Sequence, residues 1–245
     1  MIQDAIILAG GLGTRLEPLT LHTPKVLLPV FGRPFLESQL FRLSRAGVLR
    51  VRLSLGHQAQ AVLNALPRIK KFGLKVSAVR ESSPLGTGGA IRKAWPHPQK
   101  PCLVLNGDVL SDSDIGAFAK AHLASGAVAS LWLLRRENVS RYGVLTLGQK
   151  KRILRFEEKP KRARAGLINA GLYAFQPELL EFIPRSGAFS AERELFPRLL
   201  SSGSKVQGYE DPRPPYWKDI GTLEAYVEAN TDAACGRVKL EGFWR

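Results

Sequence analysis

The stretch at residues 5–16, AIILAGGLGTRL, decides the fold. Residues 5–9 are an uninterrupted apolar run that ends at glycine, which is typical of a strand buried on both faces of a sheet. The glycines that follow let backbone N–H groups approach an anion closely. Because ligands of α/β proteins bind at the carboxyl ends of parallel strands, this loop is a candidate anion site.

The loop matches neither of two common phosphate-binding fingerprints. The dinucleotide pattern GxGxxG needs a glycine where Leu16 stands, and no Gly-Lys-Ser/Thr follows as a P-loop requires. A tight turn with a solvated Arg15 is the alternative. Lys25 lies in an apolar, proline-rich stretch, where it either extends outward to solvent or meets an anion. Together, Arg15 and Lys25 are suited to hold a polyphosphate from two sides.

Strands and helices alternate through the first half of the chain. We expect further strands at residues 48–55, 75–80 and 102–105, and helices at 34–46, 57–66 and 89–95. This alternation predicts an α/β fold with a doubly wound, mostly parallel, Rossmann-like sheet.

The pattern changes after about residue 127. Apolar runs joined by short polar turns lie at residues 127–135, 142–147, 153–156 and 167–175. They predict an antiparallel β layer added at one edge or end of the sheet. Helical stretches follow near 177–182 and 191–200, and a last helix at 222–234 has Thr222 as its N-cap.

Composition excludes several classes of protein. Hydrophobic residues make up 44%, so a core can form and the chain is not disordered. Two cysteines are too few for a disulfide scaffold, and the histidines lack HExxH spacing. No apolar run reaches the roughly 18 residues that span a bilayer, and the N-terminus lacks a signal-peptide pattern, so we expect a cytoplasmic protein without a membrane partner. The net charge of +15 fits nucleic acid or phosphorylated ligands.

A series of motifs follows the first loop in a fixed order. It runs GGLGTRLEPLT (10–20), TPK (23–25), LGTGGA (85–90), LNGD (105–108), YGV (142–144), EKP (158–160), NAGLY (169–173) and WKDIGT (217–222). The series resembles the sugar-1-phosphate nucleotidylyltransferases, the pyrophosphorylases that make NDP-sugars. Each motif is weak alone, and their order along the chain carries the resemblance.

The resemblance implies a role for each matching residue. The catalytic residues it implies are Arg15 and Lys25. The nucleotide-binding residues are Gly10, Gly11, Gly13, Thr14, Gln58, Gly86, Thr87 and Gly88, of which Gln58 lies outside a distinctive motif. The sugar-phosphate-binding residues are Asn106, Gly143, Glu158, Lys159, Asn169, Gly171 and Trp217. Asp108 and Asp219 would hold Mg²⁺, a hard ion that prefers oxygen ligands. Taken singly, each of these residues also fits an ordinary turn, core or surface role.

The implied reaction joins an NTP and a sugar 1-phosphate to give an NDP-sugar and pyrophosphate. An oxygen of the sugar phosphate attacks the α-phosphorus directly and in line. Because this nucleophile is already an anion, no general base is needed, which agrees with the absence of histidine from the motifs. Positioning and charge neutralisation are then expected to supply most of the rate.

The motifs favour particular substrates. LGTGGA and FSAERELFP (189–197) look most like guanylyltransferases for mannose or heptose 1-phosphate, whereas residues 20–25 (TLHTPK) look like small uridylyltransferases. We expect GTP with D-glycero-D-manno-heptose 1-phosphate or mannose 1-phosphate, in the supply of cell-envelope polysaccharide. A uridylyl- or thymidylyltransferase is one alternative. A catalytically silent nucleotide-sugar-binding regulator is another, and the retained Arg15, Lys25 and both aspartates argue against it.

The basic run from Lys150 to Arg164 raises a nucleic-acid binder as a third class. No RRM, OB-fold or helix-turn-helix signature accompanies it, so we favour a solvated turn face and expect no nucleic-acid partner. We expect one nucleotidylyltransferase domain over residues 1–245, with a nucleotide-binding part at about 1–125 and a sugar-phosphate-binding part at about 126–235. We expect no appended β-helix or acetyltransferase domain. Homo-oligomerisation and allosteric control stay open.

Overall fold

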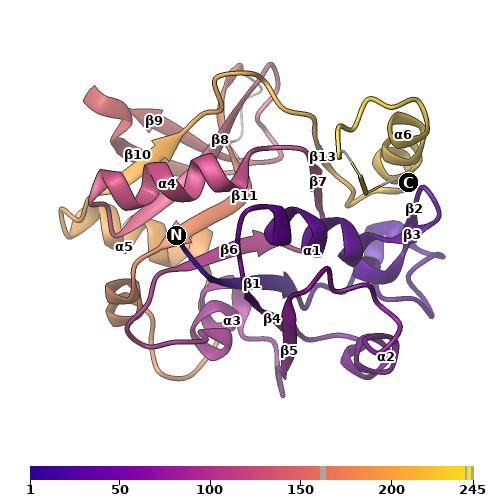
Figure 1. Ribbon diagram of the computed structural model, residues 1–245. Helices are drawn as coiled ribbons and strands as arrows, with labels where there is room; N and C mark the ends of the chain where they lie inside the picture. Colours follow the sequence, from indigo (N-terminus) through magenta and orange to yellow (C-terminus); the bar gives the residue numbers. More distant parts are fainter. Residues whose placement is uncertain (161–163, 241, 244–245) are drawn as a thin grey trace.

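Strand β1 (Asp4–Ala9) lies inside the main sheet of the computed structural model, which describes residues 1–160, 164–240 and 242–243 (Figure 1). It pairs in parallel with β4 (Arg50–Leu55) on one side and β6 (Cys102–Asn106) on the other. β5 (Lys75–Arg80) adds to β4, again in parallel. Ile7 packs into the core on one face of the sheet and Ile6 into the core on the other, as the apolar run predicts.

The second half of the chain extends this sheet beyond β6. β11 (Gly166–Phe175) runs antiparallel to β6, to β8 (Ala129–Arg136) and to β9 (Gly143–Leu147). β10 (Ile153–Glu158) pairs antiparallel with β9, whereas β12 (Val206–Tyr209) runs parallel to β8. The main path is β10-β9-β11-β6-β1-β4-β5, and β8 and β12 complete the nine strands. The predicted fold class is therefore confirmed, with β12 as a parallel strand that the sequence did not indicate.

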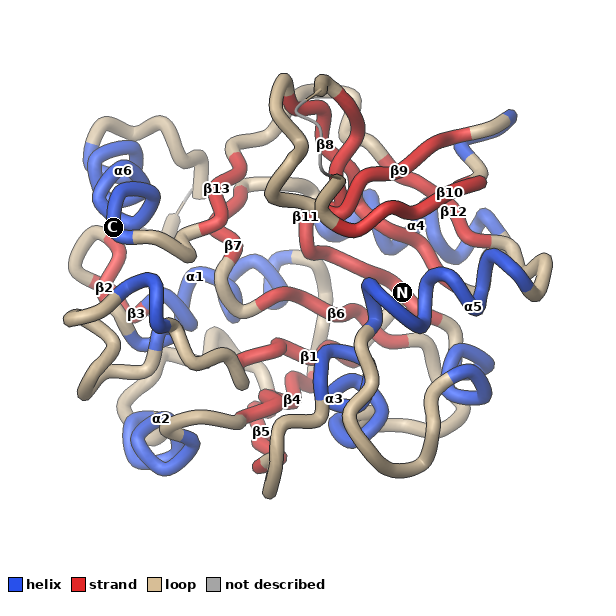
Figure 2. The backbone as a smooth tube through the Cα atoms, turned by 180° about the vertical axis from the view of Figure 1, so that it is seen from behind, coloured by secondary structure: helices blue, strands red, loops and turns tan. Residues whose placement is uncertain are grey.

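Helices cover both faces of the sheet. Their bounds are α1 (Phe35–Arg45), α2 (Ala59–Ala65), α3 (Gly86–Ala94), α4 (Ile115–Ser125), α5 (Phe196–Ser201) and α6 (Leu223–Ala234). Helices α1 and α4 share a core with Ile7 and lie in front of the sheet in Figure 1, whereas α3 and α5 lie on the side that faces the viewer in Figure 2. Thr222 caps α6 as predicted, because its hydroxyl accepts from Ala225 N at 3.3 Å.

Three helical regions differ from the expectation. Helix α3 begins three residues early, so the glycines of the LGTGGA motif form its first turn. The expected helix at 191–200 is split into a π-helical turn (Ala191–Leu195) and α5. Helix α4, which the sequence analysis missed, begins after Asp114, whose carboxylate accepts from Ala117 N at 2.8 Å.

Short elements complete the chain and shape the region beyond the sheet. They are the 3-10 turns Thr14–Leu16, Lys25–Leu27, Gln149–Lys151 and Pro177–Phe182, the pair β2 (Pro29–Val30) and β3 (Arg33–Pro34), and the pair β7 (Val109–Ser111) and β13 (Trp217–Asp219). β7 and β13 are antiparallel, and this ladder brings residues near position 219 to the end of β6. Across the three described ranges, no helix has the length and apolar character needed to cross a membrane.

Candidate active site

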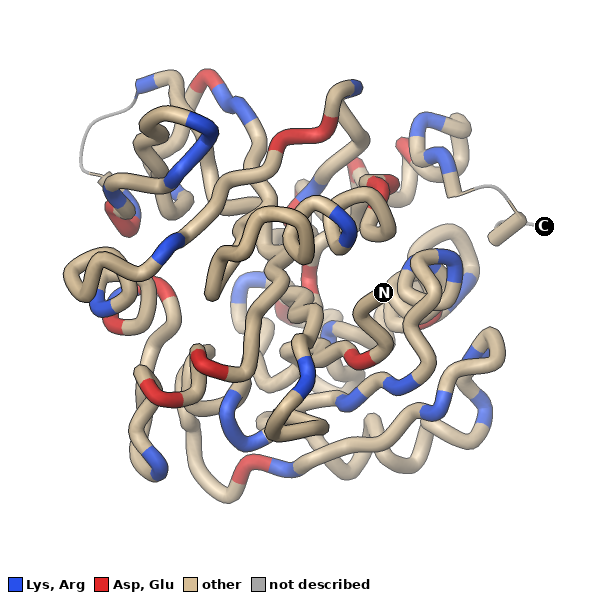
Figure 3. The backbone as a smooth tube through the Cα atoms, turned by 60° about the vertical axis from the view of Figure 1, so that its left-hand side comes forward, with Lys and Arg blue, Asp and Glu red and all other residues tan. Residues whose placement is uncertain are grey.

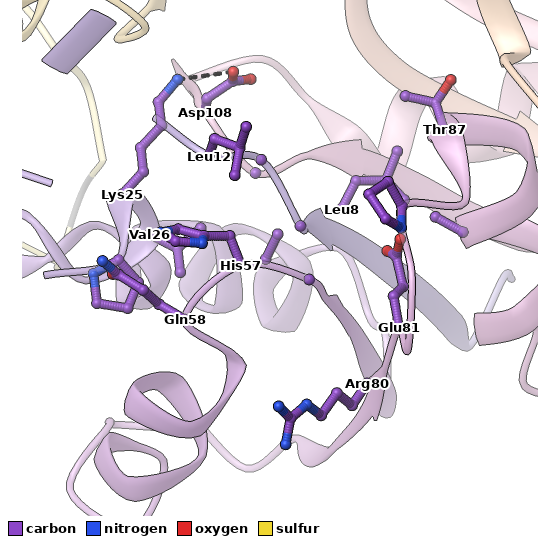
Figure 4. A pocket seen from close by; sticks show the side chains of 18 of the residues that line it. Leu8, Leu12, Lys25, Val26, His57, Gln58, Arg80, Glu81, Thr87 and Asp108 are labelled. Carbon is purple, nitrogen blue, oxygen red and sulfur yellow. Dashed lines mark hydrogen bonds and ion pairs between the residues drawn. The ribbon is translucent and has the colours of Figure 1, made fainter. Parts of the chain in front are cut away.

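A cavity of about 770 Å³ opens at the carboxyl ends of β1, β4, β5 and β6 (Figure 4). Its wall includes the glycine loop after β1, the segment around Lys25, the turn after β4, the segment after β5, the first turn of α3 and the turn after β6. This is the edge of the sheet at which the sequence predicts ligand binding. The predicted site residues are therefore expected to lie in or next to this cavity.

Most of the predicted nucleotide-binding residues line this cavity. They are Gly10, Gly11, Gln58, Gly86 and Thr87.

Three predicted nucleotide-binding residues lie outside the cavity wall. Gly13 has a φ of 72°, and its carbonyl accepts from the Thr20 hydroxyl at 2.9 Å, which fixes the turn into Thr14. Gly88 donates its N–H to Phe189 O at 2.8 Å, so this backbone donor is already used within the protein. These residues shape the loops around the cavity.

Gln58 lines the cavity, and its amide nitrogen is hydrogen-bonded to the protein. Its Nε2 donates to Thr20 O at 2.9 Å and to Leu21 O at 3.0 Å. These bonds fasten the loop after the glycine turn to the start of α2. Gln58 therefore acts as a brace for the cavity wall in this structure.

Three side chains with opposite charges converge on Gly221. A Cβ placed on Gly221 would lie 2.7 Å from Asp219 Oδ1, 2.8 Å from Arg15 Nη2 and 3.3 Å from Lys25 Nζ. The Gly221 N–H also donates to Asp219 Oδ1 at 2.8 Å. Arg15 and Lys25 thus lie together as predicted, at a point where any larger residue than glycine would intrude between them.

Asp108 joins this group through the β7–β13 ladder. Asp219 pairs with Val109, and Ile220 N donates to Asp108 O at 2.9 Å, so the two predicted metal ligands lie side by side. Lys25 Nζ lies 2.9 Å from Asp108 Oδ2, the ion pair drawn in Figure 4. Burial raises the pKa of Asp219, and the negative charge of Asp108 raises it further, while Lys25 and Arg15 oppose the shift.

The chemistry of these donors fits a hard divalent cation. Two neighbouring carboxylates supply oxygen ligands, and Mg²⁺ is commonly held by one or two carboxylates, water and phosphate oxygens. Within the described part of the chain, no cluster of three or more His, Cys, Asp or Glu side chains could hold a metal. A metal here would therefore need water or substrate oxygens to complete its coordination.

The predicted sugar-phosphate residues form a second group, of which Asn106 lines the cavity. Gly171 has a φ of 79° at the register shift of β11, and a Cβ there would lie 2.9 Å from Asn106 Nδ2. Asn169 donates to the Tyr173 hydroxyl at 2.8 Å and accepts from Gly171 N at 3.2 Å. The irregular turn of β11 therefore brings both asparagines to one place.

Glu158 and its neighbours form the rest of this group. A Cβ on Gly143 would lie 2.4 Å from the ring of Phe156 and 3.0 Å from Glu158 Oε2, so glycine leaves room for both side chains. Burial and the charge of Glu192 raise the pKa of Glu158. Lys159 is exposed, with its Nζ 3.7 Å from Glu158 Oε1. Trp217 is buried, and its Nε1 donates to Ala170 O at 2.9 Å. This bond ties β13 to β11.

Two carboxylates in this region were missed by the sequence analysis. Glu192, on the π-helical turn, accepts from Thr87 Oγ1 at 2.6 Å and from Ser190 Oγ at 3.2 Å. It links the first turn of α3 to the π-helical turn, and its negative charge acts on Glu158. It lies in the FSAERELFP stretch, which the sequence analysis used only to favour a substrate class. Glu81 lines the cavity directly after β5. A charged residue at the carboxyl end of a parallel strand was the signal that could have found it.

The basic run between Lys150 and Arg164 is partly neutralised. Lys151 Nζ lies 3.7 Å from Glu210 Oε1, and Arg164 Nη2 lies 3.1 Å from Glu157 Oε2. Lys161 and Arg162 lie outside the described residues. In the view of Figure 3, Lys and Arg occur on many separate segments and alternate with acidic ones. That the run is a solvated face stays a prediction.

The sequence model of the family described as "Nucleotidyl transferase" matches residues 4–235. The chain belongs to this family. Membership confirms the resemblance carried by the ordered motifs.

Individual members of the nucleotidyl transferase family resemble this chain closely. The mannose-1-phosphate guanylyltransferase of Mycobacterium tuberculosis is 37% identical over 235 residues, which are 95% of this chain and 65% of that protein. The chain spans less than two thirds of the length of such curated relatives. HddC from Yersinia pseudotuberculosis is 30% identical with a TM-score of 0.81, over 95% of this chain and all of that one. HddC has also been solved complexed with GMP-PN.

A more distant nucleotidyl transferase structure supports the fold alone. The putative glucose-1-phosphate thymidylyltransferase from Bacillus anthracis has a TM-score of 0.82 at 24% identity, over 94% of each chain.

Proposed function

We propose that this protein condenses GTP with a sugar 1-phosphate, either mannose 1-phosphate or D-glycero-D-manno-heptose 1-phosphate, to give a GDP-sugar and pyrophosphate. The observation that carries the proposal is the convergence of Arg15, Lys25 and Asp219 on Gly221, beside Asp108 and the cavity. The guanylyltransferase names of the curated relatives and the GMP-PN complex of HddC support the choice of base.

The proposed reaction is an in-line displacement at phosphorus. A phosphate oxygen of the sugar 1-phosphate forms a bond to the α-phosphorus of GTP, and the bond from that phosphorus to the bridging oxygen breaks. The bonding electrons leave with pyrophosphate, so no proton has to be removed from the nucleophile. Arg15 and Lys25 neutralise the charge that two polyanions bring together, and their convergence positions both substrates.

Asp108 and Asp219 are proposed to hold Mg²⁺, which would add positive charge next to the phosphates. The two carboxylates are fixed by the β7–β13 ladder and by the N–H of Gly221. Asp108 also binds Lys25, so one carboxylate serves both to hold the ion and to orient the lysine.

The sugar would lie between the two asparagines and the Glu158 carboxylate. Asn106 and Asn169 offer amide donors and acceptors, and the carboxylate of Glu158 accepts from sugar hydroxyls. Lys159, exposed at the end of β10, is proposed to meet the phosphate of the sugar. A GDP-sugar is a glycosyl donor, which suits a cytoplasmic supply of cell-envelope polysaccharide.

A pyrophosphate-release screen tests this function. ATP, CTP, GTP, UTP and dTTP are each combined with mannose, heptose, glucose and N-acetylglucosamine 1-phosphates, with and without Mg²⁺, and products are identified by mass. We expect turnover with GTP and a manno-configured sugar phosphate. Preference for UTP or dTTP would show that the enzyme selects uracil or thymine instead of guanine. Nucleotide binding without pyrophosphate release from any pair would point to a silent regulator.

A further inference from the structure

Gln39 is a polar side chain on the apolar face of α1. Leu36, Leu40 and Leu43 belong to the same face, and all four residues are buried. An amide in such a place costs stability unless its polar atoms are hydrogen-bonded, and a leucine or methionine would fill the space without that cost. Within the part of the chain that the structure describes, Oε1 of Gln39 is buried without a hydrogen-bond partner. Apolar packing alone therefore does not explain this amide.

The amide nitrogen of Gln39 faces the turn between β6 and β7. Its Nε2 donates to Asn106 O at 3.1 Å and, over a longer distance of 3.5 Å, to Val109 O. Asn106 is the last residue of β6 and Val109 is the first of β7. Because carbonyl oxygens only accept hydrogen bonds, only the nitrogen end of the amide can face both of them. One side chain thus spans the two residues between these carbonyls, Gly107 and Asp108.

The same turn is held from two other sides. Gly107 donates its N–H to Leu8 O at 2.9 Å, and a Cβ on Gly107 would collide with that oxygen, so the turn lies directly against β1. Ile220 N donates to Asp108 O at 2.9 Å, which ties the turn to the residue that follows Asp219. The backbone around Asp108 therefore has fixed partners on β1, on α1 and directly after β13.

The side chain of Asp108 is the part of the turn that remains available for chemistry. Asp108 lines the cavity, and its Oδ2 lies 2.9 Å from Lys25 Nζ. Gln39 is not among the described residues that line the cavity, so it acts on the site only through the turn. Because a displacement of about 1 Å can lower a rate about a hundredfold, the contact that fixes this backbone bears directly on catalysis.

We propose that Gln39 is a positioning residue that fixes the turn at Asp108, so that its carboxylate can hold both Lys25 and a divalent cation. This inference rests on the proposed nucleotidyltransferase function and adds to it a residue that touches neither substrate. It also gives a task to an amide that the apolar face of α1 does not need.

Gln39→Met in the full chain tests the assignment, because methionine has a similar length and no donor. We expect kcat to fall about tenfold or more and the Mn²⁺ affinity without substrates, measured by electron paramagnetic resonance, to fall about tenfold. The KM for GTP should change by no more than about threefold, because Gln39 does not touch the cavity.

Ser38→Ala is the matched control for Gln39→Met. Ser38 is also a buried polar residue of α1, but its hydroxyl donates to Phe35 O at 2.7 Å, within the helix. The control therefore loses a buried hydrogen bond of the same helix without touching the turn. It should keep wild-type turnover and Mn²⁺ affinity.

The outcomes separate this inference from the function on which it rests. A folded Gln39→Met protein that keeps the wild-type Mn²⁺ affinity overturns the role of Gln39, while GTP-dependent pyrophosphate release leaves the proposed function standing. Failure of both Gln39→Met and Gln39→Leu to fold, where Ser38→Ala folds, also overturns it, because the amide would then serve the stability of the core. A wild type that binds no Mn²⁺ overturns it as well. Weaker Mn²⁺ binding by Gln39→Met supports the inference even if the wild type releases no pyrophosphate, a result that would overturn the proposed function alone.

Discussion

The ammonium of Lys25 lies 2.9 Å from Oδ2 of Asp108, so a predicted catalytic lysine and a predicted metal ligand form one ion pair. The two residues come from the turn after the glycine loop and from the end of β6. Their pairing means that Lys25 neutralises a carboxylate on which a cation would also act. A change at either residue therefore affects both charge neutralisation and metal binding.

Lys25→Met should separate these two effects. The loss of a charge aimed at the phosphates should lower kcat by about 10²–10³, the size found for removing one transition-state donor. Asp108 Oδ2 loses its cation, so Mn²⁺ should bind more tightly in the absence of substrate. Rapid-quench turnover and electron paramagnetic resonance of Mn²⁺ measure the two quantities. Unchanged Mn²⁺ affinity would show that Lys25 does not compete for Asp108.

Arg15→Ala should abolish most turnover while leaving the fold intact. The side chain is exposed and meets the group around Gly221 only through its guanidinium, so no core contact is lost. We expect kcat/KM to fall by about 10²–10³ with an unchanged circular dichroism spectrum. Arg68→Ala, also at an exposed arginine, is the matched control and should keep wild-type turnover. Near-normal turnover in Arg15→Ala would remove Arg15 from the catalytic site.

Gly221→Ala should inactivate the enzyme by steric intrusion. The added methyl would lie 2.7 Å from Asp219 Oδ1 and 2.8 Å from Arg15 Nη2, closer than carbon and polar atoms approach in proteins. Both side chains must move, so we expect at least a hundredfold loss of kcat in a folded protein. Gly166→Ala is the control, because a Cβ there meets neighbours only at ordinary distances of 3.5 Å or more. Equal activity of the two variants would refute the convergence at Gly221.

The sequence predicted the parts of this site that depend on local pattern. The apolar run before Gly10, the strand and helix alternation, and the cap at Thr222 each depend on neighbours along the chain. The β7–β13 ladder does not, since its short strands carry no periodic signal and pair residues that are far apart in the sequence. Only the family resemblance placed Asp108 beside Asp219. Glu192 and Glu81 were missed because their contacts, with Thr87 and with Ser54, are tertiary.

The buried His122 should make stability depend on pH. Its Nδ1 lies 2.8 Å from Ser130 Oγ and its Nε2 lies 3.2 Å from Gln176 Nε2, so the ring fits as a neutral imidazole that donates through Nδ1 and accepts through Nε2. Burial lowers the pKa of His122 from 6.5 to about 4. The unfolded chain then binds a proton that the folded chain does not. The contribution of neutral His122 to stability is therefore fully present above pH 6.5 and is lost as the pH falls toward 4.

The shift corresponds to about 3 kcal/mol of unfolding free energy across that interval. Urea unfolding of the wild type and of His122→Gln between pH 7.5 and 4 measures it, since the carboxylates contribute equally to both proteins. The variant lacks the titrating ring, so its free energy of unfolding should decline less steeply between pH 6.5 and 4. The two slopes should differ by at most the uptake of one proton on unfolding. Parallel curves for the two proteins would mean that His122 is protonated in the folded state and that the buried contacts with Ser130 and Gln176 tolerate the charge.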